Sequence, residues 1–256
     1  MPRPPIPVLL LPGLEGSSHL FRRFLGAATG ALDLRPLPFP QERPLGYAEL
    51  ADHVRAAMPR RPPWILLGES FSGPMALLVA REAPRGLAGV VLAASFHRQP
   101  APRWIERLRP LARVFFTAPL PAHAVRLLLG GPDAPDELVR EVQEAVAGVP
   151  ARVMLRRAHE ALAVDATADL LSCPVPVLVL SGQHDRLLRR QIPSEIRALR
   201  RDAEVRLLDA PHLVLQRQPA EAMRLLESFA RRVCGEPSPG GDGAPGGREG
   251  VRAAPA

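Results

Sequence analysis

The sequence contains no lysine and no asparagine, and it is poor in cysteine and in aromatic residues. Its two cysteines, Cys173 and Cys234, are far apart and lack the spacing of metal ligands, so they indicate neither a disulfide framework nor a cysteine-based metal site. All 33 basic residues are arginines, and the net charge is +7. Because these arginines are scattered and no nucleic-acid-binding module is recognisable, we expect most of them to be solvated and predict no nucleic acid partner.

Long apolar runs are also absent. No stretch approaches the roughly 18 apolar residues of a membrane-spanning helix, so we predict no transmembrane segment. The apolar residues 6–11 are too few for the hydrophobic region of a signal peptide, and they indicate a β-strand instead. With neither signal recognised, a cytoplasmic location is the default expectation.

The length and composition suffice for one substantial hydrophobic core. The chain has 256 residues, of which 46% are hydrophobic, and folds of alternating strands and helices commonly form one domain at this length. From residue 235 onward the sequence is rich in glycine and proline and cannot bury an apolar face. We therefore predict a disordered tail over residues 235–256.

Short apolar runs alternate with segments of helical pattern along most of the chain. This α/β alternation predicts right-handed strand–helix–strand crossovers and a parallel sheet covered by helices on both faces. Nearly continuous apolar strands indicate burial on both sides. The predicted strands are residues 6–11, 32–37, 64–68, 88–94, 175–181 and 204–208. The predicted helices are residues 20–29, 47–58, 71–81, 191–200 and 219–233.

One long interval contains no convincing strand. It begins after the strand that ends near Ser95, and helices there would cover the carboxyl ends of the strands, where open α/β sheets bind ligands. We predict a helical cap over residues 97–167 and a core formed by residues 1–96 and 168–234. The predicted cap helices are residues 104–116, 122–129, 136–147 and 151–163.

The most informative stretch is residues 64–78, in which an apolar run ends at Ser70 among small residues and a helical run follows. Such a strand–turn–helix lifts a serine hydroxyl above the edge of a sheet, as in a nucleophile elbow. Gly68 is the expected small residue two positions earlier, whereas Ser72 replaces the usual glycine two positions later and Gly73 follows it. The alternative is a polar loop that merely joins a strand to a helix. Ser70 is the candidate nucleophile.

A serine nucleophile needs a base, and the base needs a third group to orient it. Asp185 follows one predicted strand and His212 follows the next, so both would face the same sheet edge as Ser70 in the order serine, acid, histidine. Asp209 is an alternative acid, and His184 adjoins Asp185 too closely to be oriented by it. The other histidines, expected to be satisfied or solvated, are His19, His53, His97, His123 and His159.

The loop after the first predicted strand is a candidate oxyanion hole. Preformed N–H donors must stabilise the negative oxygen of a tetrahedral intermediate. Gly13 and Gly16 allow the backbone to turn, which makes the Leu14 amide one candidate donor, and the Phe71 amide after the nucleophile is the other. A plain glycine-rich turn is the alternative. Neither a dinucleotide fingerprint nor a phosphate-binding loop occurs, so we predict no cofactor and no metal.

These motifs resemble those of the serine hydrolases of the α/β-hydrolase superfamily, and within it the small bacterial carboxylesterases that include the pimeloyl-carrier-protein methyl esterases. The resemblance covers residues 6–232 and rests on residues 11–16, 68–73, 181–185 and 210–212. It implies a three-layer α/β-hydrolase fold. Pro12-Gly13 replaces the His-Gly of many members, and the usual first antiparallel hairpin is missing, which predicts about six mostly parallel strands.

The resulting hypothesis is hydrolysis of a small-molecule carboxylic ester through an acyl-enzyme intermediate. A thioesterase or acyltransferase would use the same residues, and a non-catalytic small-ligand receptor would share the fold. The first predicted cap helix combines apolar and basic side chains that would admit an aliphatic acyl chain and an anionic carrier, although a solvated basic face is the simpler interpretation. Those side chains are Arg103, Trp104, Arg107, Arg109, Arg113, Phe115 and Phe116.

Overall fold

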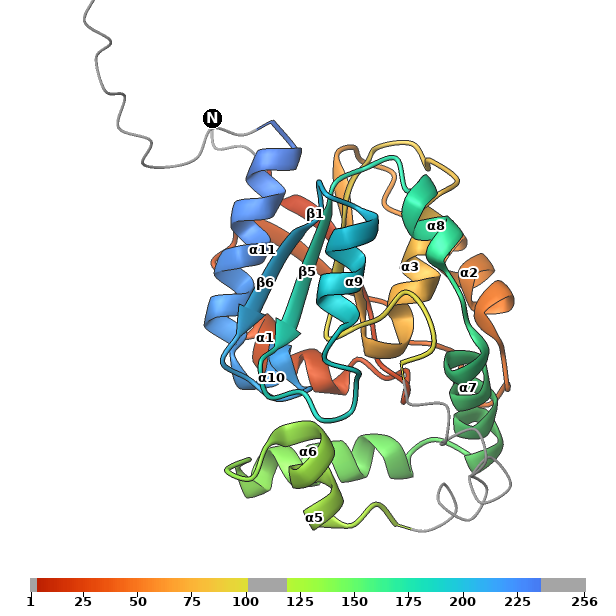
Figure 1. The fold of residues 1–256 in the computed structure, drawn as a ribbon, viewed down its shortest axis with the longest axis vertical. Coiled ribbons are helices and arrows are strands. Elements are labelled where there is room, and N and C mark those ends of the chain that lie inside the picture. Colours follow the sequence, from red (N-terminus) through yellow and green to blue (C-terminus); the bar gives the residue numbers. More distant parts are fainter. Residues whose placement is uncertain (1–3, 101–118, 236–256) are drawn as a thin grey trace, which may run out of the picture.

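The computed structural model describes residues 4–100 and 119–235. Six strands form one sheet in the order β2-β1-β3-β4-β5-β6, and every neighbouring pair is parallel. This architecture confirms the predicted six-stranded α/β fold (Figure 1). The strands are β1 (Ile6–Leu11), β2 (Leu32–Pro36), β3 (Trp64–Glu69), β4 (Leu87–Ala93), β5 (Val177–Gly182) and β6 (Glu204–Leu208).

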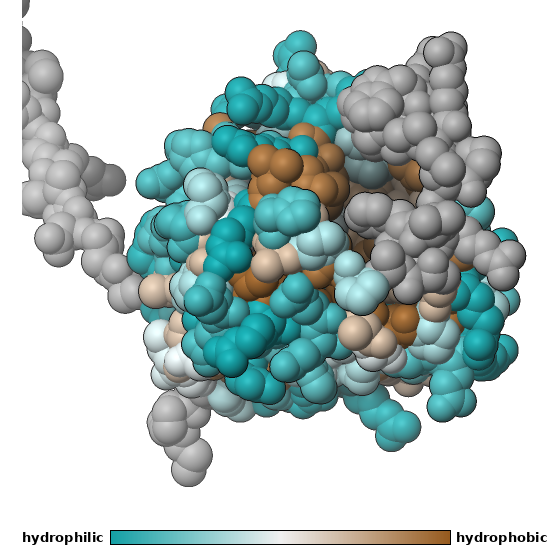
Figure 2. Space-filling model, turned by 90° about the horizontal axis from the view of Figure 1, so that it is seen from below, coloured by the Kyte–Doolittle hydropathy of each residue, from teal (hydrophilic) through white to brown (hydrophobic). Residues whose placement is uncertain are grey.

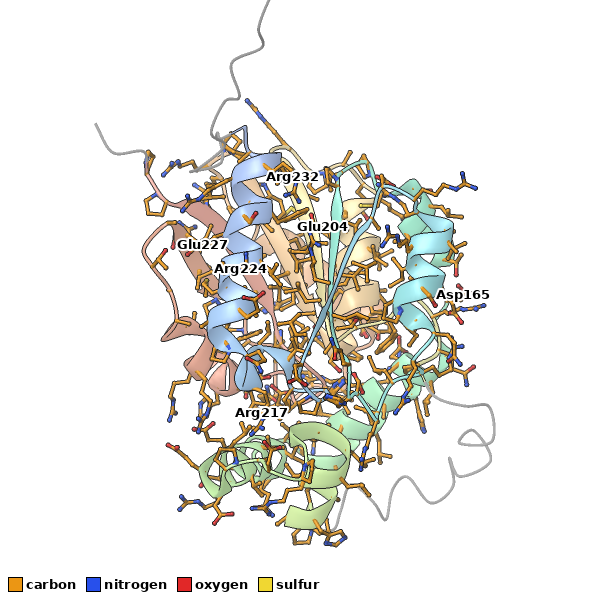
Figure 3. The ribbon with its side chains drawn as sticks, turned by 60° about the vertical axis from the view of Figure 1, so that its left-hand side comes forward. Asp165, Glu204, Arg217, Arg224, Glu227 and Arg232 are labelled. Carbon is orange, nitrogen blue, oxygen red and sulfur yellow. The ribbon has the colours of Figure 1, made fainter. Side chains whose placement is uncertain are left out.

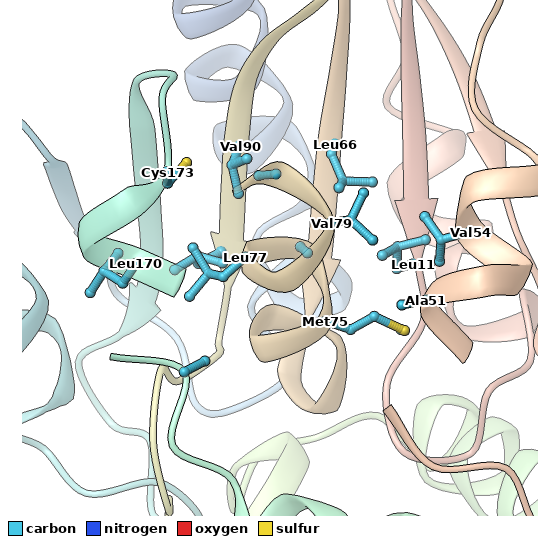
Figure 4. Packing of buried hydrophobic residues seen from close by; sticks show 14 of the residues in the cluster. Leu11, Ala51, Val54, Leu66, Met75, Leu77, Val79, Val90, Leu170 and Cys173 are labelled. Atoms are coloured by element: carbon cyan, nitrogen blue, oxygen red, sulfur yellow. The ribbon is translucent and has the colours of Figure 1, made fainter. Parts of the chain in front are cut away.

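Helices cover both faces of the sheet because successive strand residues point to opposite sides and are apolar on both. In β1, Leu9 and Leu11 belong to one buried cluster, whereas Val8 and Leu10 belong to the other. Figure 4 shows part of the first cluster, in which side chains from the sheet pack against α2, α3 and α8. The first face is covered by α2 (Tyr47–Ala56), α3 (Gly73–Ala80), α8 (Thr167–Ser172) and α9 (Ile192–Leu199). The second is covered by α1 (Arg22–Leu25), α10 (Val214–Arg217) and α11 (Pro219–Val233).

Further helices lie at the carboxyl edge of the sheet, below the strand arrows in Figure 1. Leu138 and Val142 of this group form a buried cluster with Leu20 and Leu213, which come from segments that flank the sheet. Apolar burial therefore attaches these helices to the rest of the molecule. The group comprises α5 (Ala122–Ala124), the π-helical segment η4 (Val125–Gly130), α6 (Asp136–Ala147) and α7 (Ala151–Ala163).

The division into core and cap at residues 97 and 167 stays a prediction. The predicted cap helix 104–116 lies outside the described residues. So does the predicted tail, apart from Gly235.

The ends of two predicted helices differ from the observed ones. The helix predicted over residues 20–29 is replaced by the 3-10 turn η1 (His19–Phe21) and the short α1, because Gly26 is a poor helix former and the left-handed Gly30 follows. The helix predicted over residues 71–81 starts with the 3-10 turn η2 (Ser70–Ser72) before α3 begins, since Pro74 favours the first turn of a helix.

Many of the described surface arginines are paired with carboxylates, and Arg217, Arg224 and Arg232 are among those labelled in Figure 3. Arg224 on α11 contacts Glu221 at 2.6 Å, and Arg217 on α10 contacts Asp133 at 2.5 Å. Exposed pairs of this kind contribute at most about 1 kcal/mol each. Among the described helices, none has both the length and the apolar composition to cross a bilayer.

Candidate active site

Ser70 occupies the turn between β3 and α3. Its backbone lies in the left-handed region, with φ of +49°, a conformation that is unfavourable for a residue with a side chain and is found at strained functional turns. Small neighbours make the turn possible. A Cβ on Gly68 would lie 2.6 Å from the Ser72 carbonyl oxygen, and a Cβ on Gly73 would overlap the Ser95 hydroxyl. The packing thus gives both glycines a steric role in holding the serine.

The serine that replaces the usual motif glycine makes a contact that glycine lacks. The buried Ser72 hydroxyl donates a hydrogen bond to the Pro12 carbonyl in the loop after β1. On the other side of the turn, the Ser95 hydroxyl donates to the Ser70 carbonyl at 2.5 Å. Two side-chain hydrogen bonds therefore fix the strained turn to the ends of both neighbouring strands.

A continuous chain of hydrogen bonds starts at the Ser70 hydroxyl. Ser70 Oγ lies 3.0 Å from His212 Nε2, and His212 Nδ1 lies 2.8 Å from Asp185 Oδ2. With the Nδ1 proton directed to the carboxylate, Nε2 is the acceptor for the serine hydroxyl proton. The structure brings together the three side chains that the sequence singles out, from loops after β3, β5 and β6.

Asp185 is held in place by the backbone around it. Its other oxygen, Oδ1, accepts hydrogen bonds from the Leu187 amide at 2.8 Å and the Leu188 amide at 3.0 Å. Burial acts to raise the pKa of Asp185, but the neighbouring His212 and the hydrogen bonds to the carboxylate outweigh burial and lower that pKa below its ordinary value. Asp185 is therefore a fixed anion beside the imidazole.

Asp209, the alternative acid, pairs with a histidine other than His212. Asp209 Oδ1 lies 2.8 Å from His184 Nε2, and both of these side chains are exposed. His212 and Asp185 are buried and paired with each other. The geometry favours Asp185 over Asp209 as the partner of His212. Across the described residues, no cluster of three or more His, Cys, Asp or Glu side chains is arranged to hold a metal ion.

The two candidate oxyanion donors come from the loop after β1 and from the turn that contains Ser70. The Gly16 amide donates a hydrogen bond to the Gly13 carbonyl at 3.0 Å, and this bond closes a turn. The Leu14 amide lies within the turn but takes no part in that hydrogen bond. Phe71 is fixed by Tyr47, whose ring stacks on it at 4.7 Å and whose hydroxyl donates to the Phe71 carbonyl at 2.9 Å. The Phe71 amide is thereby held at the start of η2.

Ser70 and His212 open into a cavity of about 240 Å³. Its walls are largely aliphatic and come from both the sheet edge and the helices beyond it. Figure 2 shows the molecule from the side of the carboxyl edge of the sheet, where hydrophobic side chains gather among hydrophilic ones. The apolar lining residues are Leu14, Leu20, Leu120, Ala124, Leu128, Leu129, Val142, Val146, Met154, Leu187 and Leu213.

Two buried carboxyl groups, Glu15 and Glu69, also line this cavity. Glu69 accepts a hydrogen bond from Gln216 Nε2 at 2.8 Å, and burial raises its pKa. Burial, reinforced by the charge of Glu69, raises the pKa of Glu15 to about 8. Glu15 is accordingly protonated at neutral pH, and the site avoids two adjacent negative charges.

Arg157 on α7 is fully buried against the loop after β1. Its guanidinium donates to the Leu14 carbonyl at 3.0 Å, the Glu15 carbonyl at 2.9 Å and the Pro40 carbonyl at 3.0 Å. It also lies over the Phe39 ring, 5.6 Å from the centroid. Burial lowers the pKa of Arg157 to about 10, so it remains charged at neutral pH. This residue ties the helices at the carboxyl edge to the loop after β1.

Sequence reasoning missed these supporting residues. Glu15 directly precedes Gly16, and Glu69 directly precedes Ser70. A carboxylate within a short run of apolar and small residues could have indicated that these two side chains are buried near the site. Arg157 carries no such signal, because it is one of many arginines on a helical segment and its partners are distant in sequence.

We predict that the free energy of unfolding falls as the pH rises from about 4.5 to about 8. Over this range the unfolded chain releases the Glu15 proton while the folded protein retains it, so folding becomes less favourable. The substitution Glu15→Gln removes this proton and should flatten the pH dependence by more than about 1 kcal/mol. Urea unfolding of both proteins at pH 5 and about pH 9 measures the difference; equal pH dependence would contradict a raised pKa.

We predict that Arg157→Met destabilises the protein by about 3 kcal/mol, because three carbonyls that are buried or partly buried lose a charged donor. The matched control is Arg156→Met at the preceding residue, whose half-exposed side chain pairs with Glu160 at 3.1 Å and should contribute less than about 1 kcal/mol. Urea unfolding measures both changes. Equal losses from the two substitutions would show that Arg157 does not hold the loop.

Comparison with known proteins agrees with this architecture. The family model described as "Alpha/beta hydrolase family" matches residues 8–224. An esterase from Exiguobacterium antarcticum superposes with a TM-score of 0.77 at 12% identity, over 88% of this chain and 92% of that chain. A hydrolase from Oleispira antarctica gives 0.75 at 15% identity, over 88% and 91%. A lipase-esterase related protein from Clostridium acetobutylicum gives 0.74 at 14% identity, over 89% and 95%.

These three structures share less than 25% sequence identity with this chain, and the comparison with them shows the shared fold. No curated protein matches the sequence significantly. The family model spans all six strands except the first residues of β1, together with the loops that carry Ser70, Asp185 and His212. The chain therefore belongs to the alpha/beta hydrolase family.

Proposed function

We propose that this protein hydrolyses carboxylic esters through an acyl-enzyme intermediate on Ser70. The observation that carries the proposal is the hydrogen-bonded chain from Ser70 through His212 to Asp185, which ends at an aliphatic cavity. A serine hydroxyl becomes nucleophilic when an oriented base accepts its proton. The esterases among the similar structures agree with this chemistry.

In the first step, Ser70 Oγ attacks the ester carbonyl carbon while His212 Nε2 accepts the hydroxyl proton. The carbonyl oxygen becomes an oxyanion, and the Leu14 and Phe71 amides are the proposed donors to it. The intermediate then collapses, and the bond to the alcohol oxygen breaks. His212 gives its proton to that oxygen, so the alcohol leaves and the acyl group remains on Ser70.

In the second step, His212 takes a proton from water and the resulting hydroxide attacks the acyl-serine carbonyl. Collapse of this second intermediate releases the carboxylic acid and returns the proton to Ser70. Asp185 stabilises the imidazolium in both steps, and its lowered pKa keeps it charged at neutral pH. The proton transfers between Ser70 and His212 join atoms that are already in hydrogen-bond contact.

The aliphatic walls of the cavity favour an ester with an aliphatic acyl or alcohol chain. The closer likeness to pimeloyl-carrier-protein methyl esterases, the anionic carrier and the cytoplasmic location stay predictions from the sequence. The basic and aromatic side chains that suggested a carrier, residues 103–116, lie outside the described residues. Thioester hydrolysis and acyl transfer would use the same nucleophile with a different leaving group or acceptor.

We predict that the protein hydrolyses p-nitrophenyl esters of aliphatic acids and that Ser70→Ala lowers kcat by at least about a thousandfold, because the acyl-enzyme route is lost. The control is Ser194→Ala, an exposed serine on α9 whose hydroxyl donates a hydrogen bond to the nearby Gln191 carbonyl. Release of p-nitrophenol over a series of acyl lengths measures both variants. Near-normal turnover by folded Ser70→Ala would contradict the proposal, and turnover of acyl thioesters alone would replace it with a thioesterase.

A further inference from the structure

Glu15 has a hydrogen-bonding capacity that the protein does not satisfy. Its side chain is more than nine-tenths buried and lines the cavity that contains Ser70 and His212. Among the described residues, its Oε1 atom has no hydrogen-bond partner. A buried polar atom without a partner costs free energy, which a ligand group can recover by binding to it.

The Glu15 carboxyl lies close to the reacting atoms. A Cβ built on Gly13 would lie 2.9 Å from Glu15 Oε2 and 3.9 Å from Ser70 Cβ, so the carboxyl and the nucleophile flank the same glycine. A substrate group that reaches Glu15 must therefore be near the scissile ester bond. The aliphatic walls would then contact the part of the substrate that lies farther from the ester group.

The charges around Glu15 restrict the chemistry of that group. Glu69 disfavours a second anion, and the buried Arg157 disfavours a cation. Glu69 itself is already bonded to Gln216. With a pKa near 8, the Glu15 carboxyl is neutral at pH 7. Because the backbone amides of Glu15 and Ser17 already donate to this carboxyl and only Oε1 is unpartnered, Oε1 carries the proton, and its O–H group can both donate and accept. A neutral hydroxyl group, which also donates and accepts, is complementary to it.

We propose that Glu15 is a specificity-determining residue that binds a hydroxyl group adjacent to the scissile ester, so that the preferred substrates are hydroxylated esters with an aliphatic chain. The inference rests on the proposed ester hydrolysis. The hydroxyl belongs either to the acyl part, as in a β-hydroxy acid ester, or to the alcohol part, as in a glycol ester. A site built to bind a hydroxyl discriminates against the analogue without it, because the buried carboxyl is then left unpaired.

The test compares kcat/KM at pH 7 for two pairs of esters in which a methyl group replaces the hydroxyl. Methyl β-hydroxybutyrate against methyl isovalerate tests the acyl side, and hydroxyethyl butyrate against propyl butyrate tests the alcohol side. We expect the hydroxylated ester to be favoured by about tenfold in one of the pairs, the factor that one buried hydrogen bond supplies. Titration of the released acid measures all four rates.

Three variants separate hydrogen bonding from general disturbance of the cavity. Glu15→Gln keeps a donor and an acceptor and should retain most of the preference, whereas Glu15→Leu should abolish it. Val146→Ala alters the apolar wall and should change both members of each pair by the same factor. The wild-type ratios need no variant, so they test the inference even where Glu15→Leu does not fold.

Equal kcat/KM values within both pairs for the wild-type protein would overturn the inference while leaving ester hydrolysis intact. Persistence of the preference in folded Glu15→Leu would also overturn it. Absence of hydrolysis of all four esters, together with the p-nitrophenyl esters, would instead contradict the proposed function and the inference with it.

Discussion

The left-handed conformation of Ser70 is the constraint on which the rest of the site depends. A residue with φ of +49° at the end of a buried strand is unfavourable unless its surroundings hold it there. Here the space is supplied by Gly68 and Gly73, and the hydrogen bonds by Ser72 and Ser95. A relaxed turn would move the hydroxyl away from His212, and the 3.0 Å contact on which proton transfer depends would be lost.

The carboxyl groups of Glu15 and Asp185 differ in charge at neutral pH. Glu15, which lines the cavity, is neutral at pH 7 because burial and Glu69 raise its pKa, whereas Asp185, on the other side of the imidazole, is kept anionic by His212 and two backbone amides. Two carboxyl groups thus have opposite protonation states within one site because their surroundings differ. In the proposed mechanism, this arrangement places the negative charge behind the imidazole and leaves no Glu15 charge near the oxyanion.

The parts of the fold and the site that follow strong local patterns were predictable. The strands were visible as apolar runs, and Ser70, Asp185 and His212 follow such runs at the edge where parallel strands end. Arg157 and the pairing of Asp209 with His184 were not predictable, since each depends on contacts between segments distant in sequence. Helix ends near Leu25 and Ser72 were missed because helical pattern persists beyond the point where glycine, proline and the strained turn interrupt it.

The central claim is that Ser70 is a nucleophile activated by His212. The most direct measurement is mass spectrometry of the protein after reaction with a fluorophosphonate, which forms a stable adduct with activated serines. We expect one adduct per chain, located on the peptide that contains Ser70, and we expect this adduct to be absent from folded His212→Ala. Modification of a different serine, or no modification of the folded wild-type protein, would contradict it.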